Sequence, residues 1–257
     1  MSLFAAATPA SCAHAARVRV ALWNLRHGGG NERTPAHALH LLALDADILI
    51  LTEVRAARGS QLAAALAPHG FTHTCIAAAP HEHVNRVAIL ARTPVTTVAC
   101  DSPRLVVAMT HTAGIGPLAL IAAHVPDESA PRGRADCWHA LLTHARTHAE
   151  KNCLIAADFN TSRTGMDPHR RGQTCERHMG TLTSLGYTDS WNSRAEAHAA
   201  AWSWQGPRGE RHRLDGIHLS KSLRKHAETA VYDTTCVTDG LSDHATCVLT
   251  LRSTATA

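Results

Sequence analysis

Short apolar runs separated by turn-forming residues predict a protein built largely of strands. The run at 47–52, DILILT, is almost continuously apolar, which is typical of a strand buried on both faces. Between residues 71 and 124 several short runs with strand character follow one another, and Pro94 and Pro103 stand among the breaks. The remaining expected strands cover residues 18–23, 153–157, 201–204, 214–219, 230–232 and 246–251.

Apolar residues three and four positions apart predict a smaller number of helices. The first is expected over residues 35–44, with Pro35 at its first position and Thr34 as its N-cap. Three more are expected over residues 60–67, 134–150 and 175–185.

Strand–helix pairs alternate along the chain with runs of adjacent strands. This order indicates an α/β fold in which two mixed β-sheets pack face to face with helices on the outside, rather than a doubly wound parallel sheet. No linker or internal repeat divides the chain, so we expect a single domain over residues 17–253. Residues 1–16 have no basic start, and Pro9 breaks their apolar part, which favours a disordered tail over a signal peptide.

Composition narrows the class of protein. The chain has 257 residues, of which 45% are hydrophobic and 18% charged, so it can bury a large core. No apolar run approaches the roughly 18 residues of a membrane-spanning helix. The 8 cysteines form no C-x-x-C pair and fit small buried side chains in a reducing, cytoplasmic compartment. The net charge of +4 suits a polyanionic partner without requiring one.

Polar residues interrupt the apolar pattern where the expected strands end. Residues i and i+2 of a strand point the same way, so Asp158 and Asn160 in CLIAADFNTS project together, whereas Phe159 points into the core. A single acid at a strand end is most often a turn former or a cap. The recurrence of the pattern at many strand ends indicates a functional site instead. The other polar residues at strand ends are Asn24, Glu53, His124, Asp215, Asp243 and His244.

Several of these residues suit the hydrolysis of a phosphoester. Glu53, Asn24 and Asp243 offer the hard oxygen ligands that Mg²⁺ or Mn²⁺ prefers. Asp158 can orient and deprotonate a water molecule. Asn160 can donate hydrogen bonds to a phosphate oxygen whose charge grows in the transition state.

The histidines complete this set. His244 can hold a non-bridging oxygen or donate a proton, and Asp215 can fix its tautomer. His124 can bind phosphate in a similar way. A metal site, a water-activating acid, an amide and two histidines together predict a metal-dependent phosphoester hydrolase.

The sequence resembles the endonuclease/exonuclease/phosphatase superfamily, which includes exonuclease III, AP endonucleases and DNase I. The resemblance covers nearly the whole chain, although Ala157 replaces the usual glycine before DFN. It implies a four-layered α/β sandwich and Mg²⁺-dependent phosphoester cleavage. The motifs, in family order, are WN at 23–24, TE at 52–53, the histidine of AAHVP at 124, ADFN at 157–160, RLD at 213–215 and SDH at 242–244.

The resemblance also implies roles for individual residues. Glu53 matches the principal metal ligand, Asn24 supports it, and Asp243 lies next to the metal. Asp158 matches the residue that aligns the water, and Asn160 the residue that contacts the phosphate.

The remaining motif positions carry over in the same way. Asp215 matches the residue that orients His244, and His124 occupies a position that holds Tyr or His across the family. The N-x-R and E-V-R spacings look like DNase I, in which the two arginines contact DNA. Arg26 and Arg55 are therefore candidate phosphate-binding residues, with ordinary surface arginines as the alternative.

Basic residues cluster in segments 132–134, 163–177 and 208–213, and the motif map places all three around the site. A basic rim suits a nucleic-acid backbone. We therefore expect a monomeric nuclease that binds DNA through its phosphates with little sequence specificity and does not bind membranes. Two alternatives stay open: a phosphatase or phosphodiesterase for a small-molecule or lipid phosphoester, which a narrow pocket would favour, and a non-catalytic binding protein on the same scaffold.

Overall fold

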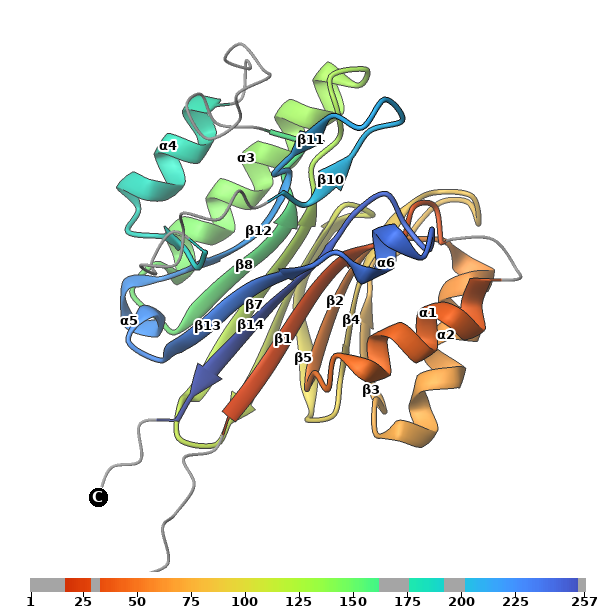
Figure 1. Ribbon diagram of the computed structural model, residues 1–257. Coiled ribbons are helices and arrows are strands. Elements are labelled where there is room, and N and C mark those ends of the chain that lie inside the picture. The colour runs from red at the N-terminus through yellow and green to blue at the C-terminus, as the bar shows by residue number, and fades with distance from the viewer. Residues whose placement is uncertain (1–16, 29–32, 162–175, 192–201, 254–257) are drawn as a thin grey trace, which may run out of the picture.

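The computed structural model describes residues 17–28, 33–161, 176–191 and 202–253 (Figure 1). The first of two six-stranded sheets contains, in spatial order, β13 (Ala227–Asp233), β14 (Thr246–Arg252), β1 (Arg17–Asn24), β2 (Ile48–Val54), β4 (Arg86–Ala91) and β3 (His73–Ile76). The second contains β5 (Val95–Ser102), β6 (Leu105–Thr112), β7 (Gly116–His124), β8 (Cys153–Asp158), β12 (Asp215–Leu219) and β9 (Thr188–Asp189). Both sheets are mixed, because β1 runs parallel to β2 and β7 parallel to β8 while their other neighbours are antiparallel.

Smaller elements surround the sheets. A separate hairpin consists of β10 (Trp204–Gln205) and β11 (Arg211–His212). The helices are α1 (Thr34–Ala43), α2 (Ala56–Leu66), the 3-10 turn Ala67–His69, α3 (Pro131–His148), α4 (Glu176–Ser184), α5 (Lys221–Arg224) and α6 (Thr235–Thr238).

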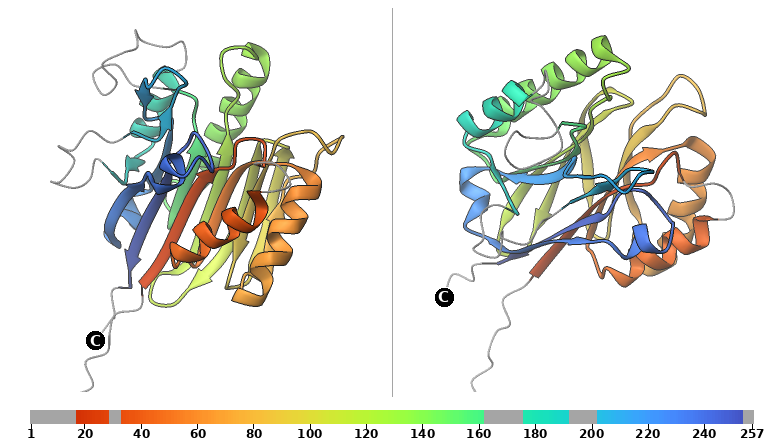
Figure 2. Two further views of the ribbon diagram at one scale, coloured as in Figure 1. Left: turned by 45° about the vertical axis from the view of Figure 1, so that its right-hand side comes forward. Right: turned by 45° about the horizontal axis from the view of Figure 1, so that its top comes forward.

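The sheets and helices form four layers, which confirms the expected α/β sandwich (Figure 2). One apolar cluster lies between the sheets, and its members include Leu22, Ile50 and Leu120. A second fills the space between the first sheet and α1 and α2, and a third lies between the second sheet and α3 and α4. Because both faces of each sheet are covered, strands such as β2 are apolar at almost every position.

The expected elements are confirmed in the main, with differences at their ends. Helix α1 begins at Thr34 itself, so Thr34 is not the N-cap; Arg33 precedes the helix and no side chain caps it. Helix α2 begins at Ala56, ahead of the expected start at residue 60, and includes Gly59. A Cβ at Gly59 would lie 2.5 Å from Val54 Cγ1, so the glycine permits the close approach of this helix to β2.

Some sequence predictions concern very short or undescribed segments. Of the strand expected over 201–204, only Trp204 lies in a strand, and residue 201 is outside the described residues. The tail expected over residues 1–16 and most of the basic segment 163–177 also lie outside them. Elements β9, β11, α5 and α6 have no counterpart among the expected elements, because two to four residues are too few to show a period.

The described cysteines and helices bear on the compartment and membrane expectations. Cys75, Cys137, Cys153, Cys236 and Cys247 are buried and free, whereas Cys100 is free and exposed. None of the helices in the described part of the chain is both long and apolar enough to cross a membrane.

Leu120 lies in the apolar cluster between the sheets and is fully buried, whereas Leu39 on α1 is 69% exposed. We expect Leu120→Ala to lower the free energy of unfolding by about 2–5 kcal/mol, because it leaves a cavity between two rigid sheets. The matched change Leu39→Ala should alter it by less than about 0.5 kcal/mol. Denaturant titration measures both values, and equal losses would contradict this placement of the core.

Candidate active site

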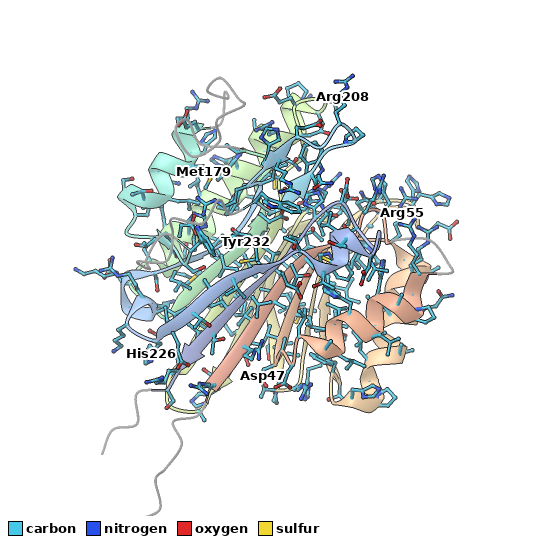
Figure 3. The ribbon with its side chains drawn as sticks, in the orientation of Figure 1. Asp47, Arg55, Met179, Arg208, His226 and Tyr232 are labelled. Carbon is cyan, nitrogen blue, oxygen red and sulfur yellow. The ribbon has the colours of Figure 1, made fainter. Side chains whose placement is uncertain are left out.

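The strand register gathers the polar strand ends into one row. On the second sheet, Asp158 at the end of β8 pairs with His124 of β7 on one side and Asp215 of β12 on the other. On the first sheet, Asn24 at the end of β1 pairs with Thr52 of β2. These residues stand at the ends of β1, β7 and β8, near the end of β2 and at the start of β12. In Figure 3, Arg55 and Arg208 lie at one end of the sandwich, and Asp47 and His226 lie at the other.

The period of two explains why these side chains face the space between the sheets. Leu154 and Ala156 of β8 belong to the inter-sheet cluster, and Asp158 continues the same alternation. Phe159 points the other way and is 2% exposed, so the expectation that it anchors the turn in the core is confirmed. The other strands repeat this change from apolar to polar: Asn24 follows Leu22, His124 follows Ala122, and Asp215 precedes Ile217.

Glu53 reaches the site by a different route. Strand alternation alone would place it with Leu49 and Leu51, on the face that packs against the helices. The pairing of β2 with β4 is irregular between Leu51 and Val54, and Glu53 itself has a φ of 57°. This left-handed residue within a bulge turns the carboxylate toward the site, where Oε1 lies 3.4 Å from Asn24 Nδ2.

Asp158 is the most buried carboxylate of the site, with 1% of its surface exposed. Its Oδ2 accepts a hydrogen bond of 2.9 Å from Asn24 Nδ2, which joins the two sheets, and its Oδ1 accepts one of 3.0 Å from the Asn160 backbone N–H. Burial, followed by the negative charge of Asp215, raises the pKa of Asp158 to about 7; the positive charge of His244 and the two hydrogen bonds oppose this rise.

His244 and Asp215 form a buried ion pair. His244 Nδ1 lies 2.8 Å from Asp215 Oδ2, and both residues are buried. Burial by itself lowers the pKa of His244, but the charge of Asp215 and this hydrogen bond outweigh it, and the pKa rises to about 10. His244 is therefore a cation at neutral pH, and the expected pairing of Asp215 with His244 is present.

His124 has the opposite character. Burial and the positive charge of Arg104 hold its pKa well below the usual value, so the ring is neutral. Its Nε2 lies 3.7 Å from Glu53 Oε1 and 3.8 Å from Asp158 Oδ2. Arg104 Nη1 lies 2.6 Å from Nδ1 and 3.3 Å from Nε2 of the same ring, so the guanidinium packs against the imidazole.

The donor set fits a divalent cation. The side chains of Asp158, Asp215 and His244 cluster here, with one polar atom of each within 4.8 Å of the others. Because His244 is a cation, the carboxylates rather than the imidazole are the ligands that this cluster offers. In the described part of the chain, Asp215 Oδ1 and Asp243 Oδ1 are buried oxygens that accept no hydrogen bond. Buried carboxylate oxygens without a donor suit a hard cation such as Mg²⁺.

Asn24 and Glu53, two of the three expected metal ligands, are held by their neighbours. Asn24 Oδ1 accepts the backbone N–H of Arg26 at 2.9 Å, so the amide turns its NH₂ toward the carboxylates of Glu53 and Asp158. Glu53 Oε2 accepts the backbone N–H of His27 at 2.7 Å and lies 2.8 Å from His27 Nδ1. In this arrangement Asn24 acts as a donor that orients both carboxylates.

A cleft of about 560 Å³ opens above Asp158, with Asn160, Asp243 and His244 on its lining. The lining does not include Arg26 or Arg55. Arg26 is exposed, with Nε 3.8 Å from Asp243 Oδ1, and Arg55 donates from Nε to Asn85 Oδ1 at 3.2 Å.

The sequence did not single out several polar residues of the cleft: His27, Asn85, Arg104, Asp127, Glu128, Ser129 and Arg134. His27 follows Asn24 closely but has a φ of 58°, which no local pattern predicts. Asn85 lies on the loop between β3 and β4 of the first sheet, and Arg104 lies on the turn between β5 and β6 of the second sheet. Of these residues, only Arg134 belonged to a pattern noted in the sequence, the basic segment 132–134, and that pattern predicted a position on the rim of the site rather than in the cleft.

Trp204 forms one wall of the cleft. Its Nε1 donates to Asp243 Oδ2 at 3.3 Å, and its ring stacks on His212 with the centroids 5.6 Å apart. Trp202 lies under Arg211 instead, 4.5 Å from the guanidinium carbon to the ring centroid. Of the two tryptophans in AWSW, only Trp204 therefore faces the cleft.

Residues 21–244 match the model of the endonuclease/exonuclease/phosphatase family. The chain belongs to this family. Endonucleases, exonucleases and phosphatases all hydrolyse phosphoester bonds, so the protein is a phosphoester hydrolase. Divalent-metal dependence is typical of the family, in agreement with the acidic and histidine cluster at Asp158. No curated protein sequence is similar enough to match the chain.

Solved structures with the same fold include nucleic-acid enzymes. A variant of the 3' phosphatase NExo from Neisseria, bound to a product DNA hairpin, is 21% identical over 90% of this chain and 98% of its own, with a TM-score of 0.73. An AP endonuclease from Archaeoglobus fulgidus is 17% identical over 90% and 98%, with a TM-score of 0.74. AP endonuclease LMAP from Leishmania major is 14% identical over 92% and 88%, with a TM-score of 0.73.

The raised pKa of Asp158, about 7, has a consequence for stability. A group with a higher pKa in the folded state stabilises the fold when protonated, and this contribution is lost as the pH rises through the folded-state value. With EDTA present, we expect the free energy of unfolding of the wild type, relative to Asp158→Asn, to fall between about pH 4 and about pH 8. Denaturant titrations of both proteins measure the difference, and a constant or rising difference would contradict the raised pKa.

Proposed function

We propose that the protein is a Mg²⁺-dependent phosphodiesterase that acts on DNA with little sequence specificity. The observation that carries this proposal is the convergence on Asp158. The buried carboxylate of Asp158, the cationic His244 and the neutral His124 line one cleft. The amide of Asn24 donates to the Asp158 carboxylate and orients it. Phosphoester hydrolysis requires a base that activates water, hydrogen-bond donors to the phosphate oxygens and carboxylates that bind a cation, and these residues provide all three.

The protein groups divide the work as follows. Asp158 orients the attacking water and takes up its proton. His244, a cation held by Asp215, donates a hydrogen bond to a non-bridging phosphate oxygen, and neutral His124 supports the phosphate from the other side. Asn160 Nδ2 already donates to the Val125 carbonyl at 2.9 Å, which leaves its second N–H for the phosphate.

Glu53, Asp243 and the buried carboxylate of Asp215, which lies beside Asp158, would hold the cation. A divalent cation bound there supplies charge stabilisation to the phosphoester as negative charge develops on its oxygens. Asn24 keeps Glu53 and Asp158 in place through its NH₂ group. Without such a donor the two carboxylates would repel each other inside the cleft.

A nucleic-acid substrate is supported by the basic residues at this end of the molecule. Arg26 and Arg55 lie beside the cleft on the loops that follow β1 and β2, and we assign them to backbone phosphates beyond the scissile one. Arg208 lies at the same end, on the turn between β10 and β11 (Figure 3). Neighbouring folds include one bound to DNA, which agrees with this assignment.

One observation favours a second candidate, a phosphatase or phosphodiesterase for a small or terminal phosphoester. Asp127 and Glu128, on the loop before α3, line the cleft. Their negative charge disfavours a phosphate backbone that would continue across that rim. The Neisseria neighbour with the same fold is a 3' phosphatase, which supports this candidate.

A substrate panel tests the proposed function. Plasmid DNA, abasic duplex, single-stranded oligonucleotide and a small phosphoester are incubated with the pure protein in Mg²⁺, Mn²⁺ or EDTA. We expect cleavage of DNA in Mg²⁺ and none in EDTA. Metal-dependent release of phosphate from the small ester alone would support the second candidate, and no metal-dependent reaction with any substrate would refute both.

Asp158→Asn tests whether the scaffold is catalytic. This change removes the group that accepts the water's proton, so we expect kcat to fall by about 10² or more. Asp136→Asn provides a matched control, because Asp136 is exposed on α3 and the change in charge is the same. Cleavage assays of the three proteins measure the effect. Equal rates for Asp158→Asn and wild type would favour a non-catalytic binding protein.

A further inference from the structure

Helix α3 contacts the site through neighbouring side chains on one face. Cys137 Sγ lies 3.7 Å from the carbonyl oxygen of His124, and the ring of Trp138 stacks on Phe159 with the centroids 5.6 Å apart. One turn earlier on the same face, Arg134 Nη2 donates to the carbonyl oxygen of Asn160 at 2.8 Å. The helix therefore holds two consecutive residues of the turn that follows Asp158.

This turn has a left-handed backbone conformation at Asn160, with a φ of 43°. Asparagine adopts this region more readily than other residues with a Cβ, and several hydrogen bonds fix the turn further. Its own backbone N–H donates to Asp158 Oδ1, and its side chain donates to the Val125 carbonyl. Its carbonyl oxygen accepts from Arg134, so the direction of this carbonyl depends on the position of the guanidinium.

Arg134 is 3% exposed, although it contributes to the lining of the cleft. The same Nη2 that donates to the Asn160 carbonyl also donates to Thr161 Oγ1 at 3.0 Å. Thr161 Oγ1 in turn donates to the Phe159 carbonyl at 2.8 Å. The guanidinium thus joins the residues on both sides of the Asn160–Thr161 peptide, which fixes the orientation of that peptide plane.

We propose that Arg134 is a positioning residue: it holds Asn160 in its left-handed conformation and so keeps the Asn160 amide aligned with the phosphate. The catalytic part of this inference rests on the proposed function, whereas the Arg134–Asn160 contact does not. Arg134 differs in this respect from Arg26 and Arg55, which are assigned to the substrate itself. The planar guanidinium holds its N–H groups in fixed directions, whereas the ammonium of lysine sits on a flexible stem and its N–H groups rotate freely, so lysine orients these acceptors less strictly.

Kinetics separate positioning from phosphate binding. In assays on a labelled duplex oligonucleotide with Mg²⁺, we expect Arg134→Gln to lower kcat about 10- to 100-fold, because a small displacement of Asn160 weakens the transition-state contact. KM should change by less than about two-fold. The matched control Arg146→Gln removes the same charge from the exposed last turn of α3 and should leave both constants unchanged. A rise in KM with kcat unchanged would show instead that Arg134 binds phosphate.

A double-mutant cycle tests whether Arg134 acts through Asn160. In an Asn160→Ala background, we expect Arg134→Gln to lower kcat by less than about two-fold, because the group that it positions is already absent. Multiplication of the two single effects would overturn the proposal. Near-UV circular dichroism verifies that each variant is folded. If Arg134→Gln is not, Arg134→Lys takes its place in the cycle, because it keeps the charge but loses the planar donors with fixed directions.

A measurement without substrate keeps this inference distinct from the proposed function. In ¹⁵N–¹H spectra we expect the side-chain NH₂ resonances of Asn160 to shift in Arg134→Gln or Arg134→Lys and to remain in place in Arg146→Gln. Unmoved Asn160 resonances in the Arg134 variant would overturn the positioning role. If the wild type cleaves none of the substrates yet these resonances shift, the proposed function fails while the contact stands.

Discussion

The carboxylate of Asp158 is the constraint around which the site is built. A carboxylate with almost no exposure to water loses its hydration, and the protein must replace that hydration or leave the group protonated. The protein replaces the lost hydration in part, because hydrogen bonds from Asn24 and Asn160 and the cationic His244 favour the charged form. Burial and the charge of Asp215 favour the protonated form. The result is a pKa near neutrality, which suits a group that exchanges a proton with water.

The two sheets contribute unequally to this balance. The second sheet supplies Asp158, His124 and Asp215 from adjacent strands in register, so their spacing follows from the β-ladder itself. The first sheet supplies Asn24 and Glu53, and the Asn24–Asp158 hydrogen bond connects the two sheets. The inter-sheet core therefore determines how closely the two halves of the site approach each other, and packing far from the cleft has a direct bearing on its geometry.

Positive charge in this protein serves two different purposes. Arg134 and Arg213 are largely buried; Arg134 holds the Asn160 turn, and Arg213 pairs with Asp189 at 2.8 Å. Arg26 and Arg208 are exposed and Arg55 is half-buried, and Figure 3 shows Arg55 and Arg208 at the end of the molecule that carries the cleft. The basic segment 208–213 thus contains an exposed arginine, Arg208, and a largely buried one, Arg213. The number of basic residues in such a segment is therefore larger than the number that can contact a polyanion.

The sequence by itself determined the strand ends, the polar residues on them and the α/β sandwich, because period-two alternation and apolar runs are local properties of the chain. It also placed Asp158 and Phe159 on opposite sides for the same reason. Asn160 reaches the cleft as expected but lies beyond the end of β8 with a φ of 43°, so the turn rather than strand alternation places it there. Only the tertiary structure decided that Glu53 turns into the site through a bulge, and that Asn24 presents its NH₂ rather than its oxygen. It alone placed Arg104 and Arg134 at the cleft, since their roles depend on contacts between segments distant in sequence, which no local pattern encodes.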